Sequence, residues 1–285
     1  MPNSFEVIRD EIYWRKALSK SVTATKVGSL VPIETRILKN YKKSNIQFEV
    51  RYMFDKSQLR ITKDVPIENP FQPWDKDLEI APIGPHHTLI LNKYPVQVGH
   101  MLLITNNWAP QQGWLSLEDW KALEHVDQDT CGLWFFNSGP SAGASQPHRH
   151  IQLLRRRYSE IYCPRDSWFE DILNQKDKKE SLLGESISVI EREYDDDANI
   201  LYKKYLKTCM SLDIGSPELD KIPRLPYNLL ISKKWMAGVR RSKESTKGFN
   251  INALGFAGYL LATKESELTW LELNGLEELL SLVIG

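Results

Sequence analysis

Cysteine is scarce in this sequence, and the few that occur form no framework. Cys131, Cys163 and Cys209 lie far apart, are odd in number and include no CxxC pair. This excludes a disulfide framework and argues against a structural zinc site. No run of eighteen apolar residues occurs, and the N-terminal stretch lacks the apolar core of a signal peptide. We therefore expect a cytoplasmic protein with reduced cysteines.

The sequence also lacks net charge. Lys plus Arg and Asp plus Glu each number 37, so nothing in the overall charge favours nucleic acid or a membrane as the main partner. Small molecules remain, including anionic ones, because a local basic site needs no net charge. The 285 residues, of which 41% are apolar, are enough for one large domain, and we expect a single domain over residues 1–285.

Hydrophobic spacing indicates an α+β domain, with an antiparallel sheet joined by hairpins or loops and with separate flanking helices. We predict helices at 5–20, at 116–128 with a capping box from Ser116 to Asp119, and near 276–283. We predict strands at 46–54, 88–91, 100–105, 132–136, 148–154 and 227–232. Residues 1–45 are expected to be a helical segment, the five-proline stretch 66–85 to be irregular, and the charged stretch 166–222 to be a helical insertion.

Two histidines and a glutamine stand at alternate positions in the stretch GASQPHRHIQLL. In a strand, His148, His150 and Gln152 project to one face, about 6–7 Å apart from one to the next. Three explanations remain open at this point. The histidines are half-exposed and without a role, they ligate a metal, or one of them is a nucleophile. A metal site lacks an evident carboxylate or cysteine ligand, whereas neutral imidazole is available as a nucleophile at pH 7.

The loop before this strand, NSGPSAGASQP at residues 137–147, favours the nucleophile. Its glycines let backbone N–H groups approach a phosphate closely, and its serines add hydroxyl donors. An ordinary surface loop has a similar composition, so the pattern gains weight only from the histidines that follow it. Among the other histidines, we expect His100 to make a buried hydrogen bond between strands and His87 to lie at the exposed end of a strand.

Four stretches together resemble one family. NSGPSAGASQPHRHIQLL is similar to the signature of the diadenosine tetraphosphate phosphorylases, also called ATP adenylyltransferases, which form the transferase branch of the histidine-triad superfamily. NPFQPW at 69–74, LILNKYPVQVGHMLLIT at 89–105 and NALGFAGYLLA at 252–262 agree. The resemblance spans about residues 46–165 and 223–285. It implies a HIT-like fold with an inserted helical segment.

The resemblance also implies roles for single residues. His150 would attack an α-phosphorus to form an AMP–histidine intermediate. His148 would orient the site and fix the tautomer of His150, in part through its backbone carbonyl, and Gln152 would hydrogen-bond the phosphate. The remaining substrate-binding residues implied are Asn92, Lys93, Asn137, Gly143, Ala144, Ser145, Gln146, Asn252, Ala253, Leu254 and Tyr259. Lys56 is the candidate for the family's phosphate-binding lysine near the N-terminus, and Lys264 is a further substrate-binding candidate, one position after the family's usual lysine. Core packing is the alternative explanation for Leu254 and Tyr259.

Gln152 suits phosphorolysis better than hydrolysis. Glutamine is neither an acid nor a base, and water needs a general base, whereas inorganic phosphate is already an anion at pH 7. The expected reaction is therefore diadenosine tetraphosphate plus phosphate to ATP plus ADP. Alternatives are a hexose-1-phosphate uridylyltransferase, in which proline usually replaces Arg149, and a non-catalytic nucleotide-binding regulator. We expect no metal site, no tightly bound cofactor, magnesium at most with the nucleotide, and a monomer or homodimer.

Overall fold

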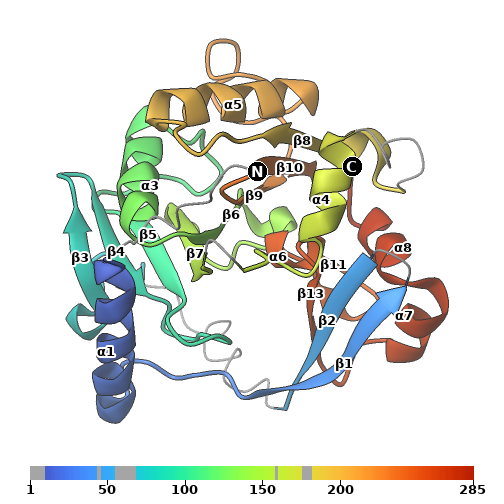
Figure 1. The fold of residues 1–285 in the computed structure, drawn as a ribbon, viewed down its shortest axis with the longest axis horizontal. Coiled ribbons are helices and arrows are strands. Elements are labelled where there is room, and N and C mark those ends of the chain that lie inside the picture. The colour runs from blue at the N-terminus through green and yellow to red at the C-terminus, as the bar shows by residue number, and fades with distance from the viewer. Residues whose placement is uncertain (1–9, 44–45, 55–68, 158–159, 175–181) are drawn as a thin grey trace, which may run out of the picture.

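The computed structural model describes residues 10–43, 46–54, 69–157, 160–174 and 182–285 (Figure 1). Within this part of the chain, eight antiparallel strands form one sheet in the order β3-β4-β5-β7-β6-β9-β10-β8. Their bounds are β3 Glu79–Ile83, β4 His87–Leu91, β5 Met101–Thr105, β6 Gly132–Asn137, β7 His150–Arg155, β8 Ile187–Glu191, β9 Tyr227–Ile231 and β10 Trp235–Arg240. β7 and β6 therefore lie at the centre of the sheet.

Two smaller sheets accompany the large one. β1 (Thr35–Lys43) and β2 (Ile46–Met53) form an antiparallel pair, and β13 (Tyr259–Ala262) joins β2 in parallel. β11 (Ser245–Thr246) pairs with β12 (Phe249–Asn250). The helices are α1 Ile12–Val27, α3 Leu117–Asp129, α4 Asp166–Leu173, α5 Ala198–Ser211, α6 Ala253–Phe256, α7 Leu268–Asn274 and α8 Leu276–Ser281.

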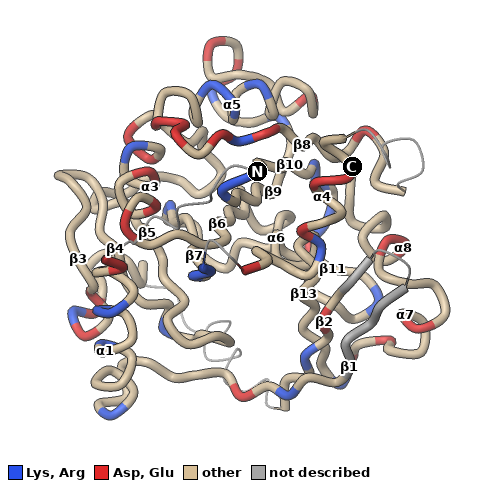
Figure 2. Tube along the Cα trace, viewed as in Figure 1, with Lys and Arg blue, Asp and Glu red and all other residues tan. Residues whose placement is uncertain are grey.

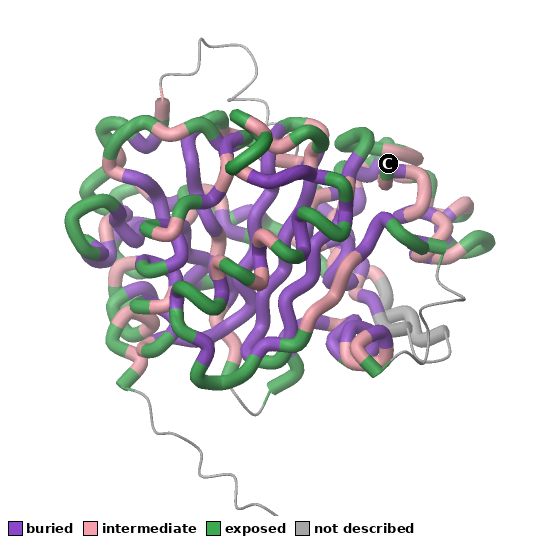
Figure 3. Tube along the Cα trace, turned by 90° about the horizontal axis from the view of Figure 1, so that it is seen from above, coloured by how far each residue is buried: buried purple, intermediate pink, exposed green. Residues whose placement is uncertain are grey.

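Both faces of the large sheet are buried, and Figure 3 shows the buried chain as a band bordered by exposed segments. β6 shows why: Trp134 and Phe136 enter the core shared with α1, α3 and α5. Leu133 and Phe135 enter the core shared with α4, α6, α7, α8, β2 and β13. A strand covered on both faces reads as a continuous apolar run, as residues 132–136 do.

Several expectations are confirmed. The α+β class and the antiparallel sheet are as predicted, and β2, β4, β5, β6 and β9 lie within one or two residues of the predicted strands. α3 carries the predicted capping box: the Ser116 hydroxyl accepts the Asp119 N–H at 3.3 Å, and Asp119 accepts the Ser116 N–H at 2.7 Å. The predicted C-terminal helix is α8.

Three stretches differ from the prediction. The helix α1 begins at Ile12, after residues 10 and 11 that are not helical, and the predicted residues 5–9 lie outside the described chain. Residues 1–45 are not wholly helical because they include β1. The stretch 166–222 is not wholly helical either, because β8 pairs with β10 at the edge of the large sheet. Residues 66–85 include β3, where Pro82 is tolerated because β3 is an edge strand.

Charge is mixed over the surface, as the balanced composition implies. Figure 2 shows basic and acidic segments interspersed on the helices and loops, with neither sign filling one side of this view. In the described parts of the chain, no helix has both the length and the apolar character needed to cross a membrane.

Candidate active site

The geometry of His150 fixes the proton on its ring. His150 begins β7, and its Nδ1 lies 2.8 Å from the carbonyl oxygen of His148. A carbonyl only accepts, so Nδ1 carries the proton and Nε2 keeps its lone pair. Nε2 makes no hydrogen bond to a described residue. The expected action of the His148 carbonyl on the tautomer is thus present in the geometry.

Burial keeps this imidazole neutral. Removal from water lowers the pKa of His150 to about 4, while the hydrogen bond to the His148 carbonyl acts in the opposite direction and nearby His148 lowers the pKa further. At pH 7 the ring is therefore uncharged and its Nε2 lone pair is available. Only 3% of His150 is exposed, because Phe71 packs against the ring with centroids 5.4 Å apart.

His148 is held from both sides of its ring. Nε2 lies 2.9 Å from the Thr105 carbonyl, to which it must donate, and Nδ1 accepts from the Asn69 side chain at 2.7 Å. His148 stands before β7, in an isolated bridge to Pro110, so β7 begins two residues later than predicted. Burial lowers the pKa of His148 as well. The half-exposed Trp108 packs edge-on against the His148 ring, at 5.3 Å.

Gln152 lies on the same face of β7 as His150, near His100. Burial lowers the pKa of His100 to about 4, and the Gln152 carboxamide acts in the opposite direction. Asn92 donates to Nδ1 of His100 at 3.1 Å, so His100 is hydrogen-bonded as expected, but the bond is only partly buried and joins the residues next to β4 and β5. Asn92 is thereby placed within this cluster, whereas its predicted neighbour Lys93 is exposed with its ammonium group 5.9 Å from the Tyr94 ring.

The loop between β6 and β7 is partly ordered by its own hydrogen bonds. The N–H of Gly143 donates to the Pro140 carbonyl at 2.8 Å, and the N–H of Ala144 donates to the Gly139 carbonyl at 2.9 Å. The N–H groups of Ser145 and Gln146 have no such bond in the part of the chain described. These two amides are therefore among the loop donors that remain for an anion.

This loop packs against the second predicted substrate segment. The side-chain oxygen of Asn137 accepts the N–H of Ala253 at 2.9 Å. Gly143 has φ +85°, and a Cβ there would lie 2.7 Å from Cβ of Asn252, so only glycine fits this turn and this close approach. Asn252 caps α6 by accepting the N–H of Leu254. The fold thus joins residues that lie more than 100 positions apart.

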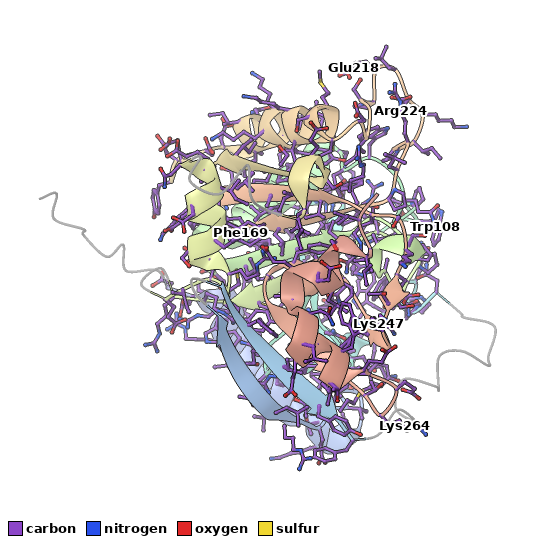
Figure 4. All side chains as sticks on the ribbon, turned by 90° about the vertical axis from the view of Figure 1, so that its right-hand side faces the viewer. Trp108, Phe169, Glu218, Arg224, Lys247 and Lys264 are labelled. Atoms are coloured by element: carbon purple, nitrogen blue, oxygen red, sulfur yellow. The ribbon has the colours of Figure 1, made fainter. Side chains whose placement is uncertain are left out.

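Three other predicted residues lie apart from this cluster or outside the described chain. The Tyr259 hydroxyl is bound by Arg156 at 3.0 Å, and burial raises its pKa. Lys264 is exposed, and Figure 4 separates it from Trp108, whose ring lies against His148. Lys56 lies outside the described residues.

Sequence reasoning missed residues that hold the histidines. Asn69 lies in a stretch that the family resemblance included, but its contact with His148 crosses 79 positions. His87 was expected at an exposed strand end, and this is wrong. It is buried, and its Nε2 lies 2.9 Å from Asp119, which also binds Arg149. Gln111, which is buried and accepts the N–H of His150, is a further omission. No local pattern marks these contacts.

No metal centre is evident in residues that the structure describes: no group of three or more His, Cys, Asp or Glu side chains is placed to hold an ion. The chemistry available is that of the imidazole and of hydrogen-bond donors. A neutral histidine at the start of a central strand, preceded by a loop with amides that lack a partner in the described chain, can accept a phosphorus-bound group and pass it on. Such an arrangement suits a nucleotidyltransferase.

Sequence comparison identifies the family. Residues 3–163 match the Ap4A phosphorylase N-terminal domain, and residues 176–284 match the ATP adenylyltransferase C-terminal domain. The first match alone covers more than half of the chain. The chain belongs to the Ap4A phosphorylase family.

Relatives from Saccharomyces cerevisiae agree with this assignment. Protein APA1 is 30% identical over 202 residues, which cover 64% of this chain and 63% of that protein. Diadenosine 5',5'''-P1,P4-tetraphosphate phosphorylase 2 is 27% identical over 291 residues, which cover 89% of this chain and 88% of that protein. The chain therefore matches less than two thirds of the first relative and most of the second.

The fold is that of solved yeast structures. The yeast Ap4A phosphorylase Apa2 in complex with AMP superposes with a TM-score of 0.75 and 23% identity, covering 97% of each chain. The same enzyme in complex with Ap4A gives a TM-score of 0.71, covering 96% of this chain and 97% of the other. The expected HIT-like fold is confirmed.

Proposed function

We propose that the chain catalyses phosphorolysis of diadenosine tetraphosphate to ATP and ADP through a covalent AMP–His150 intermediate. The proposal is supported by family membership, and the observation that carries the chemistry is the arrangement of His150. Its ring is neutral, its Nδ1–H is fixed on the His148 carbonyl at 2.8 Å, and its Nε2 is without a hydrogen bond to any described residue.

In the first step, the Nε2 lone pair attacks an α-phosphorus, the N–P bond forms, and the P–O bond to the rest of the molecule breaks. ATP leaves as an anion that needs no proton. The ring gains positive charge as the bond forms, so the Nδ1–H···O=C bond to His148 becomes charge-assisted and stronger in the transition state. The His148 side chain, held by Thr105 and Asn69, keeps that carbonyl in place.

In the second step, inorganic phosphate attacks the AMP–His150 phosphorus, the N–P bond breaks, and ADP leaves with the imidazole neutral again. Phosphate is already an anion near pH 7 and needs no base. Gln152 stands where a base would serve water, and its carboxamide supplies a hydrogen-bond donor without accepting a proton. This difference favours phosphate over water as the acceptor.

The substrate-binding roles belong to the same proposal. The N–H groups of Ser145 and Gln146, unbonded in the described chain, suit the polyphosphate. The bond between Asn137 and Ala253 supports the binding of one nucleotide by both segments. Asn252, Leu254 and Tyr259 are partly exposed, as contacts to adenosine require. Lys56, Lys93, Lys264, Asn92, Gly143 and Ala144 keep their predicted substrate-binding roles.

We also propose a cytoplasmic enzyme, monomeric or homodimeric, that acts on small molecules and not on nucleic acid or membranes. Magnesium enters only with the nucleotide, and no cofactor is tightly bound. The balanced charge, 37 basic and 37 acidic residues, supports the choice of small-molecule substrates. Light scattering checks the oligomeric state of the purified protein. It is measured once without nucleotide and once with nucleotide from which magnesium has been removed.

Product analysis tests the reaction. The protein is incubated with labelled diadenosine tetraphosphate and phosphate, and the nucleotides are separated. We expect ATP plus ADP, with ADP formation dependent on added phosphate. AMP plus ATP would contradict phosphorolysis in favour of hydrolysis, and the absence of any product would leave a nucleotide-binding protein without turnover. Uridylyl transfer between hexose phosphates would support the uridylyltransferase alternative.

A further inference from the structure

The two central strands part at the end where the site lies. The β6–β7 pairing ends at Phe135 and Gln152, and two further steps in the same register would place Asn137 opposite His150. Both strands nevertheless continue to pair with their outer neighbours, β9 and β5, as far as these two residues. The sheet is therefore open between β6 and β7 only beside the nucleophile.

The side chain of Gln111 fills this opening. Its Oε1 accepts the N–H of His150 at 2.8 Å, and its Nε2 donates to the carbonyls of Asn137 at 2.8 Å and His150 at 3.2 Å. Its own N–H donates to the Pro147 carbonyl at 2.8 Å. Gln111 is 1% exposed, so water does not replace these bonds.

A carboxamide suits this position for a physical reason. Where two strands part, buried peptide groups lose their ladder partners, and each group left unpaired destabilises the fold because it has been removed from water without a new hydrogen bond. A glutamine side chain has two donors and one acceptor group, and here it satisfies two carbonyls and one N–H. No other uncharged side chain of similar length offers two donors together with an acceptor oxygen. The opening is thus stabilised, and residues 138–147 have room to bend away from His150.

We propose that Gln111 is a positioning residue for the nucleophile: its carboxamide keeps β6 and β7 apart and holds the His150 peptide so that Nε2 faces the α-phosphorus. The inference rests on the proposed function. Gln111 does not touch the reacting atoms. It acts through the backbone of His150 and, because Asn137 also binds Ala253, it ties the nucleophile to the segment proposed for adenosine.

The test compares Gln111→Met and Gln111→Glu with the control Gln128→Met, which changes an exposed glutamine on α3. Adenylylation of the enzyme is followed in single turnovers with labelled diadenosine tetraphosphate, and substrate affinity is measured separately. We expect Gln111→Met to slow adenylylation by about 100-fold, as a misplaced reacting group does. Affinity should change far less, and Gln128→Met should behave as the parent.

Gln111→Glu adds a pH-dependent readout. When it is protonated, the glutamic acid side chain has one donor for the carbonyls of Asn137 and His150. When it is ionised, it has no donor, and its carboxylate repels both carbonyl oxygens. Adenylylation by this variant should therefore fall further as pH rises from 5.5 to 8, while Gln111→Met keeps the pH profile of the parent. A purely structural role for Gln111 would not produce this difference between two folded variants.

Amide hydrogen exchange in the parent protein covers the case of a variant that does not fold. The His150 amide should exchange as slowly as its neighbours inside β7, because Gln111 holds it. Rapid exchange of this amide, or folded Gln111 variants that adenylylate at the parent rate, would overturn the inference and leave the proposed function intact. A parent protein that turns over no diadenosine tetraphosphate would instead overturn the function.

Discussion

Two buried polar clusters share the stretch 148–150 and lie on opposite faces of it. The histidine cluster consists of His100, His148 and His150, and the aspartate cluster consists of His87, Asp119 and Arg149. Arg149 stands between the two site histidines, so its side chain points to α3 where theirs face the site. Both clusters are buried, yet one is kept neutral and the other is charged.

The difference comes from the partners. His148 and His150 donate to backbone carbonyls, and no carboxylate of the described chain is among the causes of their pKa shifts, so burial lowers the pKa of both. In the aspartate cluster, burial raises the pKa of Asp119, but the hydrogen bond from His87 and the charge of Arg149 outweigh it and hold the pKa low. Similar burial therefore leaves a neutral nucleophile on one face and, on the other, the buried ion pair of Asp119 and Arg149, which we call the anchor.

The largest effect is expected from removing the nucleophile. His150→Ala should lower turnover of diadenosine tetraphosphate by at least about 1000-fold while the protein stays folded, because no other described group of the site replaces Nε2. His125→Ala, on the exposed face of α3, is the matched control and should keep parent activity. Appreciable turnover by folded His150→Ala would remove His150 as the nucleophile.

Removing the anchor should cost stability. Asp119→Ala leaves Arg149 buried without its carboxylate, so the free energy of unfolding should fall by about 3–5 kcal/mol in urea titrations. Glu118→Ala removes the neighbouring exposed partner of Lys121 and should leave stability close to that of the parent. Similar losses in the two variants would show that the aspartate cluster is no anchor.

A smaller effect is expected from giving the site a base. Gln152→His should raise hydrolysis relative to phosphorolysis, seen as a rise of about tenfold in the ratio of AMP to ADP. This is below the usual contribution of a general base, because the new imidazole is not held in place. A ratio equal to that of the parent would refute the role assigned to glutamine.

The smallest effect is the response to pH. A pKa of about 4 leaves His150 neutral from pH 7.5 to 5.5, so single-turnover adenylylation should change by less than about twofold. An imidazole with an ordinary pKa near 6.5 would be protonated as pH falls, and the rate would drop about tenfold at pH 5.5. Such a drop would show that His150 becomes charged in this pH range, and the contrast between a neutral histidine cluster and a charged aspartate cluster would then fail.

The sequence predicts the parts of the fold that local pattern determines. The capping box from Ser116 to Asp119 marks α3, and apolar runs mark β4, β5, β6 and β9. The pattern fails at β8, whose few apolar residues lie among charged runs and whose strand character depends on pairing with β10. It fails likewise at β1, which is a strand only in its pairing with β2.

The candidate site likewise combines residues that a local pattern marks with residues that only distant contacts bring together. The alternation of His148 and His150 and the glycine-rich loop are local, so the nucleophile could be proposed from the sequence. Gln111 could not, because it meets His150 across 39 positions and lies in no motif. Asn69 lies in a stretch that resembles the family, but nothing local marks its contact with His148 across 79 positions. The same holds for Arg149, whose partner Asp119 reads as an ordinary capping residue.

Trapping the intermediate tests the central claim most directly. The parent protein is mixed with labelled diadenosine tetraphosphate without phosphate, quenched at alkaline pH to preserve the N–P bond, digested and analysed by mass spectrometry. The account predicts an adenylyl group on the peptide that contains His150, located on that residue by fragmentation and lost when phosphate is added before the quench. An adduct on another residue, or turnover to ATP and ADP with no adduct at all, would contradict it.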